Sequence, residues 1–199
     1  MSRVVLATHN PHKVVEFAAI VNTHRPDLEV VGYDGPEPVE DGVTFAENAL
    51  IKARAAAAHT GLAAFADDSG ISVDVLGGAP GIFSAYWAGH AKDAVANRRL
   101  LLDQLSDVVK PEQRRAQFRS TIALVLPSGE EFTVEGVWHG ALATEERGEN
   151  GFGYDPVFVP DVDGRPGTLS AAEISAEEKN AQSHRARAFV NLVPLLERI

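Results

Sequence analysis

The chain has no cysteine, which excludes disulfides, thiolate zinc sites, iron–sulfur clusters and cysteine nucleophiles. Long apolar runs are also missing: no stretch approaches the ~20 residues of a membrane span, and the N-terminus MSRVVLATHN lacks a secretory signal pattern. Positive charge is scarce, because 18 Lys and Arg stand against 28 Asp and Glu, a formal net charge of −10. We therefore expect a cytoplasmic protein that binds neither nucleic acid nor membrane. A strongly anionic small substrate would need a local group of cations and a metal.

The composition and the pattern of segments predict one α/β domain over residues 1–199. Hydrophobic residues make up 45% and charged residues 23%, as in ordinary globular proteins. We expect a central mixed β-sheet flanked by helices. Expected strands cover 3–7, 28–31, 62–66, 72–76, 117–126, 131–138 and 154–159. Expected helices begin at Pro11, at the capping boxes of Thr44 and Ser175, and at Lys92. We expect Gly61 to end the second helix. We expect the last helix to be interrupted near Ser183 and to kink or stop at Pro194.

The first loop, Thr8-His9-Asn10-Pro11-His12-Lys13, joins a strand to a helix. Free backbone N–H groups and the helix dipole attract anions at such a place, and Lys13 adds a full charge. The loop lacks the glycines of a Walker motif, so its local sequence alone favours an ordinary capped turn.

Asp67 and Asp68 follow an apolar segment, and we expect them at the end of its strand. Adjacent side chains on an extended backbone point to opposite faces. One carboxylate is then available for a metal or a water molecule while the other anchors the loop; the alternative is an aspartate-rich turn. Glu40 or Asp41 could join Asp68 at a hard cation, or could belong to a solvated acidic loop.

Three further segments carry groups that can bind a ligand or have a structural role. Lys52 lies on the second predicted helix, where it can reach a phosphate or only extend into solvent. The segment Phe152-Gly153-Tyr154-Asp155 offers a ring for stacking, a close approach and a carboxylate, although a core aromatic is the commoner meaning. Near the C-terminus, Lys179, His184 and Arg185 supply donors, or form a solvated basic face.

Five segments in order, THNPHK, FAENALIKARA, ADDSG followed by VDVLGGAPGIFSA, GFGYDPVF and EEKNAQSHRARA, resemble the inosine-triphosphate pyrophosphatase family. The resemblance extends from Thr8 to Arg185. It implies two lobes with the active site in the cleft between them, a homodimer, and Mg²⁺ as cofactor. It also implies hydrolysis of ITP, dITP and XTP to the nucleoside monophosphate and pyrophosphate, which removes non-standard purines from the nucleotide pool.

The resemblance assigns roles position by position. Asp68 corresponds to the catalytic base near the magnesium, with Glu40 as the other metal carboxylate. In our hypothesis Asp68 activates the water that attacks the α-phosphorus. Substrate contacts are implied for Thr8, His9, Asn10, Pro11, His12, Lys13 and Lys52 at the phosphates, for Ser69, and for Phe152, Gly153, Tyr154, Asp155, Lys179, His184 and Arg185 around the base.

Two residues depart from the family pattern. His9 stands where many members have a small residue such as glycine, and can narrow the loop or add a pH-sensitive phosphate contact; Tyr86 stands where arginine is common. Three other readings remain: a Maf-type pyrophosphatase acting on pyrimidine or modified nucleotides, a nucleotide-binding regulator without catalysis, and a structural interaction protein.

Overall fold

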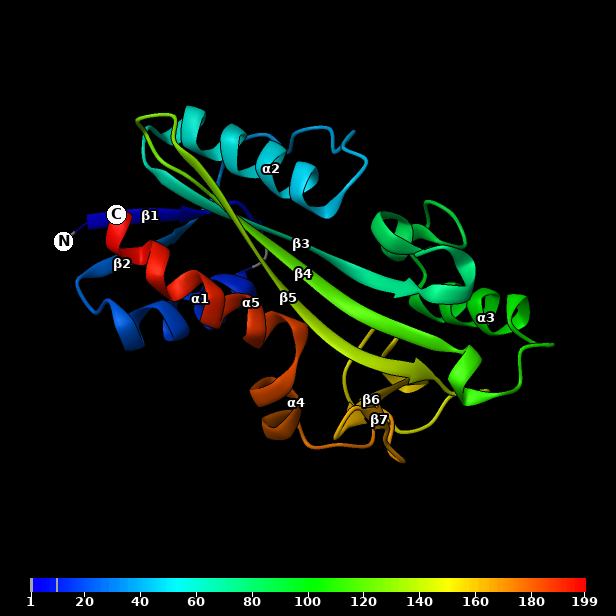
Figure 1. Ribbon diagram of the computed structural model, residues 1–199. Helices are drawn as coiled ribbons and strands as arrows, with labels where there is room; N and C mark the ends of the chain where they lie inside the picture. The colour runs from blue at the N-terminus through cyan, green and yellow to red at the C-terminus, as the bar shows by residue number, and fades with distance from the viewer. Residues whose placement is uncertain (1, 10) are drawn as a thin grey trace. The chain divides into compact units, whose positions relative to one another are not determined.

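In the computed structural model, which describes residues 2–9 and 11–199, seven strands form one sheet in the order β2-β1-β3-β4-β5-β6-β7 (Figure 1). The sheet is mixed, because β1 pairs in parallel with β2 and β3 whereas β5 and β6 pair antiparallel. Helices accompany the strands along the chain. The predicted α/β class with a central mixed sheet is therefore confirmed.

The bounds of the elements follow the chain order. The strands are β1 Ser2–Leu6, β2 Leu28–Gly32, β3 Ala63–Val73, β4 Arg115–Val125, β5 Glu131–Leu142, β6 Phe158–Val162 and β7 Arg165–Pro166. The α-helices are α1 Pro11–His24, α2 Phe45–Thr60, α3 Ala94–Gln104, α4 Ala176–Gln182 and α5 His184–Leu192. Short 3₁₀ turns cover Asp74–Leu76, Gly81–Tyr86, Pro111–Gln113, Asp155–Val157 and Val193–Arg198.

The chain divides into two compact units. The first runs up to Asp68 and includes Ser120–Gly136 and Ala188–Ile199. The second comprises Ser69–Arg119 and Val137–Arg187. Strands β3, β4 and β5 each contribute residues to both units, and β3 passes from one to the other between Asp68 and Ser69.

The first unit buries both faces of its strands, because alternate residues of a strand point to opposite sides. Val4, Leu6 and Phe65 face a core shared with α1 and α5. Val5 and Ala64 face a second core, filled largely by the alanines of α2. The small alanine side chains let α2 pack close to the sheet, and this packing positions the polar residues of α2.

The second unit has its own aromatic core. Phe118 from β4, Trp138 from β5 and Phe158 from β6 pack together with residues of α3. Phe118 meets the ring of Phe158 edge-on at 4.6 Å between centroids. This core supports the segment before β6, whose Tyr154 is buried in it.

Most predicted helix boundaries hold for local reasons. Pro11 begins α1, where its missing N–H costs no hydrogen bond. Gly61 ends α2 with a left-handed backbone (φ +70°). The Ser175 capping box is complete at α4, and Ser183 separates α4 from α5 as expected. At α2 the capping box is only half formed, because Glu47 accepts from the N–H of Val43 instead of that of Thr44.

Three strand predictions were wrong. The segment 72–76 is not a separate strand, because β3 ends at Val73 and Asp74–Leu76 form a 3₁₀ turn. Asp67–Gly70 is not a turn after a strand but the middle of the continuous strand β3, because Lys13 and Lys52 bind the two carboxylates in place of the N–H groups of a turn. The segment from Tyr154 begins with a 3₁₀ turn at Asp155–Val157, and β6 starts only at Phe158. Pro156 cannot donate to a strand ladder, which explains the turn.

Arg114 is a buried cation held entirely by backbone carbonyls. Its side chain is 2% exposed. It donates to the carbonyls of Leu105, Val108, Leu142 and Ala143 at 2.7–2.9 Å. The guanidinium thus joins the end of α3 to the end of β5.

Within the described residues, no helix has the length and apolar character needed to cross a bilayer.

We expect Arg114→Ala to lower the free energy of unfolding by about 3–5 kcal/mol, because four buried carbonyls lose a charged donor. Urea unfolding measures the change. Arg115→Ala is the matched control: Arg115 pairs with Asp161 at 2.6–2.8 Å nearer the surface, and its loss costs about 1 kcal/mol or less. Equal losses in the two variants would contradict the role given to Arg114.

Candidate functional site

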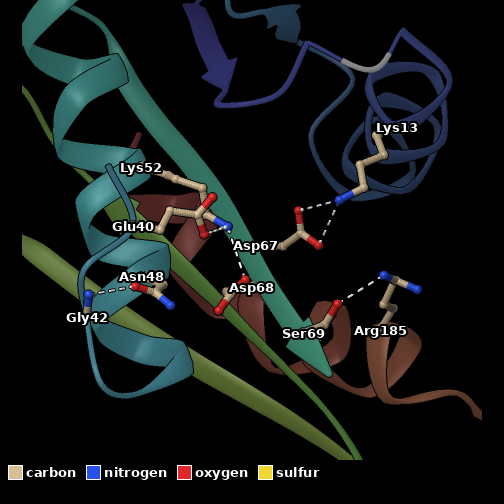
Figure 2. A network of polar contacts seen from close by, with 9 residues as sticks. All are labelled: Lys13, Glu40, Gly42, Asn48, Lys52, Asp67, Asp68, Ser69 and Arg185. Atoms are coloured by element: carbon tan, nitrogen blue, oxygen red, sulfur yellow. Dashed lines mark hydrogen bonds and ion pairs between the residues drawn. The ribbon is translucent and has the colours of Figure 1, made fainter. Parts of the chain in front are cut away.

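In the first unit, one ammonium group lies between two carboxylates. Lys52 on α2 places its Nζ 3.0 Å from Glu40 Oε2 and 3.2 Å from Asp68 Oδ1 (Figure 2). Glu40 belongs to the loop before α2 and Asp68 to β3. Because both carboxylates approach the same cation, they lie close together despite their like charge.

Burial sets the protonation behaviour of this group. It raises the pKa of Asp68 above its ordinary value, more than the nearby Lys52 ammonium lowers it. Burial also works to lower the pKa of Lys52, but the charges of Asp68 and Glu40 outweigh it and the pKa rises. Lys52 therefore stays charged, and Asp68 is a stronger base than a solvated carboxylate.

The side-chain amide of Asn48 fixes the loop that contains Glu40 to α2. The side-chain oxygen of Asn48 accepts a hydrogen bond from the N–H of Gly42 at 2.9 Å (Figure 2). A Cβ on Gly42 would lie 2.6 Å from that oxygen, so this close approach needs glycine. The contact anchors the loop two residues after Glu40.

Asp67 has a different partner from Asp68. Lys13 on α1 places its Nζ 3.1 and 3.3 Å from the two carboxylate oxygens of Asp67 (Figure 2). The two adjacent carboxylates thus pair with two helices, in agreement with the prediction that they point apart. Of the predicted first loop, Asn10 and the side chains of Pro11 and His12 lie outside the described residues.

The second unit contains a cavity of about 360 Å³. All eight of the residues predicted to lie near the base, or to contact substrate beside it, line this cavity: Ser69, Phe152, Gly153, Tyr154, Asp155, Lys179, His184 and Arg185. The structure therefore brings together residues from β3, the segment before β6, α4 and α5. Local sequence alone gave these segments no common site.

A buried carboxylate organises one wall of the cavity. Asp155 is 3% exposed, forms an ion pair with Lys179 and accepts the N–H of Phe152 at 2.8 Å. The ring of Phe152 is 65% exposed, and Lys179 Nζ and Arg185 Cζ lie 5.0 and 5.5 Å from its centroid. An exposed aromatic ring beside two cations is suited to stacking against a flat, electron-rich ligand.

The break before α5 places the other two basic residues. His184 is buried, and its ring stacks on Phe118 at 4.9 Å with an interplanar angle of 14°. Arg185 donates to the hydroxyl of Ser69 at 3.0 Å (Figure 2). The first two residues of α5 therefore contact side chains of β4 and β3.

Sequence analysis missed the opposite part of the lining, formed by Gly70, Ser84, Ala85, Lys92, Ala94, Asn97 and Phe118. The hydroxyl of Ser84 accepts the N–H of Ile71 at 2.9 Å and donates to the carbonyl of Gly81. The carbonyl of Ser84 accepts the hydroxyl of Tyr154 at 2.8 Å. The sequence signal for three of them was their place in the quoted motifs, because Gly70 ends ADDSG and Ser84 and Ala85 end VDVLGGAPGIFSA.

Tyr86, one of the two departures from the family pattern, makes aromatic contacts within the second unit. Its ring stacks on His90 at 5.3 Å and meets Phe83 edge-on at 5.9 Å. At the position where arginine is common in the family, this chain thus has a tyrosine that belongs to a small aromatic cluster.

The two carboxylates of the first unit fit a hard divalent cation. Among the described residues, no group of three or more His, Cys, Asp or Glu side chains is arranged to hold a metal ion. Glu40 and Asp68 still supply carboxylate oxygens, one 3.0 Å and the other 3.2 Å from Lys52 Nζ. Magnesium is commonly bound by one or two carboxylates together with substrate phosphates.

Comparison with known proteins identifies the family. The family model described as "Ham1 family" matches residues 4–195. This chain belongs to the Ham1 family. A curated relative from Leifsonia xyli, named dITP/XTP pyrophosphatase, is 61% identical over 196 residues, covering 98% of this chain and 96% of its own length. The inosine-triphosphate pyrophosphatase family predicted from the sequence is thereby confirmed.

Solved structures of Ham1 proteins agree with the fold. The Staphylococcus aureus Ham1 protein has a TM-score of 0.88 and 37% identity, with 98% of each chain covered. A Mycobacterium abscessus structure titled nucleoside-triphosphatase / dITP/XTP pyrophosphatase has a TM-score of 0.81 and 47% identity, covering 96% of this chain and 99% of that one.

Proposed function

We propose that this Ham1-family chain hydrolyses dITP, ITP and XTP to the nucleoside monophosphate and pyrophosphate, and so removes non-standard purines from the nucleotide pool. The observation that carries the proposal is the pairing of Lys52 with both Glu40 and Asp68. This arrangement offers a base, a second carboxylate and a cation for a charged phosphate. The names of the curated relatives support the same substrates.

In this proposal Glu40 and Asp68 hold Mg²⁺. The ion would neutralise charge on the phosphates and on the leaving pyrophosphate. Lys13 and Lys52 add two cations to the same task, each released from its carboxylate partner as a phosphate binds. An acidic protein thereby gathers the local positive charge that a triphosphate requires.

Asp68 accepts a proton from the water that attacks the α-phosphorus. An ionised carboxylate can accept this proton, and the position of Asp68 beside Lys52 places it next to the proposed phosphate site. The α–β phosphoanhydride bond breaks, and pyrophosphate leaves with the electron pair of that bond. Binding and orientation of the triphosphate fall to the loop Thr8–Lys13 and to Lys52.

The cavity of the second unit binds the purine base. Phe152 stacks on the base, while Lys179, His184 and Arg185 direct donors to the 6-oxo group shared by hypoxanthine and xanthine. The 6-amino group of adenine would meet those donors with a donor of its own, which leaves polar groups unpaired. Ser69 and Asp155 hold two of these cations in place.

We propose further that residues 1–199 act as one domain, in which the first unit binds the triphosphate and the second unit binds the base. The change of unit between Asp68 and Ser69, consecutive in β3, supports this division of labour. The homodimer and the cytoplasmic location remain predictions from the resemblance and the composition.

A product assay tests the proposed function. With Mg²⁺ present, ITP and XTP should yield pyrophosphate, and ATP and GTP little of it. Release of orthophosphate would mean attack at the terminal phosphate and would contradict the proposal. A preference for pyrimidine nucleotides would favour the Maf-type reading, and tight binding without turnover would favour a regulator.

We expect Asp68→Asn to lower kcat for ITP by at least about 100-fold, because the amide cannot accept the proton. Nucleotide affinity, measured by calorimetry with Mg²⁺, should stay within a few fold. Asp67→Asn is the control, since it removes the neighbouring carboxylate that pairs with Lys13, and should lower kcat much less. Retained turnover in Asp68→Asn would place the base elsewhere.

We expect Arg185→Ala to reduce the ratio of kcat/KM for ITP over ATP by about 10- to 100-fold, the effect of losing one charged hydrogen bond. Arg187→Ala is the control, because Arg187 donates to the carbonyl of Gln182 and is not among the residues lining the cavity. An equal loss for ITP and ATP would show that Arg185 acts on the phosphates or on the fold.

A further inference from the structure

His9, the other departure from the family pattern, contacts the acidic loop that contains Glu40. Its ring nitrogens lie 2.9 Å from two oxygens, with Nδ1 facing Glu37 Oε1 and Nε2 facing the carbonyl of Gly35. Its ring also stacks on Tyr33 at 5.6 Å between centroids. The side chain of His9 thus engages residues 33–37 on three sides.

These contacts require the charged form of the ring. A neutral imidazole has one N–H, whereas a carbonyl and an ionised carboxylate only accept hydrogen bonds. Both contacts are therefore satisfied only when both nitrogens carry protons. The bond to Glu37 and the bond to the Gly35 carbonyl both raise the pKa of His9. Asp34 adds a weaker attraction.

The loop that receives His9 is tightly wound around Tyr33. The Tyr33 hydroxyl donates to the carbonyl of Pro36 at 2.9 Å, and a Cβ on Gly35 would lie 2.4 Å from the Tyr33 hydroxyl oxygen. The ring of His59 also meets Tyr33 edge-on, and its Nε2 lies 3.7 Å from Asp34 Oδ1. The contacts of Tyr33 therefore fix the backbone at Gly35, whose carbonyl is one of the two acceptors for His9.

His9 connects two segments of the first unit, and each of them carries a residue of the site a few positions further along the chain. Four residues after His9, Lys13 pairs with Asp67. Three residues after Glu37, Glu40 pairs with Lys52. Contact between these segments at His9 limits how far the Lys13 loop can move from the carboxylate loop.

We propose that protonated His9 is a positioning residue, which holds the Thr8–Lys13 loop against the Glu40 loop and so favours binding of the metal–nucleotide. The inference rests on the proposed roles of Lys13 and Glu40 in triphosphate binding. It gives His9 a task within the protein, in place of a direct contact with phosphate. Loss of the proton breaks one of the two hydrogen bonds and loosens the loop.

The sign of the pH dependence follows. Because the pKa of His9 is raised in the folded protein, the contact is complete below the ordinary histidine pKa of about 6.5 and is lost as pH rises through the higher value. Affinity for nucleotide should fall over that interval. A direct contact of protonated His9 with phosphate would give the same pH dependence of affinity. A variant of Glu37 is therefore needed to distinguish the positioning role from the phosphate contact.

The first test follows the His9 ring by NMR in the full nucleotide-free chain. The pKa of His9 should lie above 6.5, and Glu37→Gln should lower it. Asp34→Asn is the matched control, since it removes a carboxylate of the same loop that makes no hydrogen bond to His9, and should lower it less. A pKa that Glu37→Gln leaves unchanged would overturn the proposal, whatever the activity of the protein.

The second test measures KM and kcat for ITP between pH 6 and 9. We expect the ratio of the KM of the unmodified chain to the KM of His9→Gln to rise about two- to fivefold across the His9 titration. Ionisation of the nucleotide affects both KM values equally and so does not change their ratio. Glutamine keeps one donor but does not titrate. The corresponding ratio of kcat values should not change with pH. His59→Gln is a control, because His59 contacts the same Tyr33 ring, and this variant should keep the pH-dependent change in KM.

Two outcomes would count against the proposal. A flat KM ratio would show that His9 has no positioning role. A step that persists at full size in Glu37→Gln, in which His9 has lost its hydrogen bond to a carboxylate, would assign His9 to the phosphate itself. Failure of the proposed function would look different: Asp68→Asn would keep turnover while the NMR behaviour of His9 remained as described.

Discussion

The contact of Lys52 with Glu40 and Asp68 is the interaction on which the first unit's site depends. Two carboxylates at this separation repel each other, and burial adds to the cost of their charges. One ammonium group 3.0 and 3.2 Å away compensates both. The alanine-rich face of α2 is what permits this, because it lets the helix lie close enough to β3 for Lys52 to reach Asp68.

Much of the fold follows from local sequence, and the boundaries show why. Pro11, Gly61 and Ser183 act through their own backbone properties or caps, so their effects could be predicted without a structure. The middle of β3 could not. Asp67 and Asp68 are turn-forming residues by local preference, and only cations from two distant helices make the extended conformation acceptable there.

The site divides in the same way. The order of five motifs brought together eight of the residues that line the cavity of the second unit, because a family pattern carries long-range information that local periodicity lacks. Ser84 and Asn97 were missed because their roles come from packing: each binds backbone groups of segments remote in sequence. For His9 the sequence marked the position but not the partner, since Glu37 lies 28 residues away.

The division into two units separates chemistry from selection in the proposed function. A triphosphate is the same in every nucleotide, so Lys13, Lys52 and Asp68 have no means of distinguishing ITP from ATP. Discrimination must come from groups that contact the base, where a donor facing a 6-amino group leaves both unpaired. Changes at Arg185 and at Asp68 should therefore alter different kinetic quantities, unless base binding also orients the α-phosphorus. In that case Arg185→Ala would lower kcat for ITP as well, and the connection between the units through β3 would be the first place to seek the coupling.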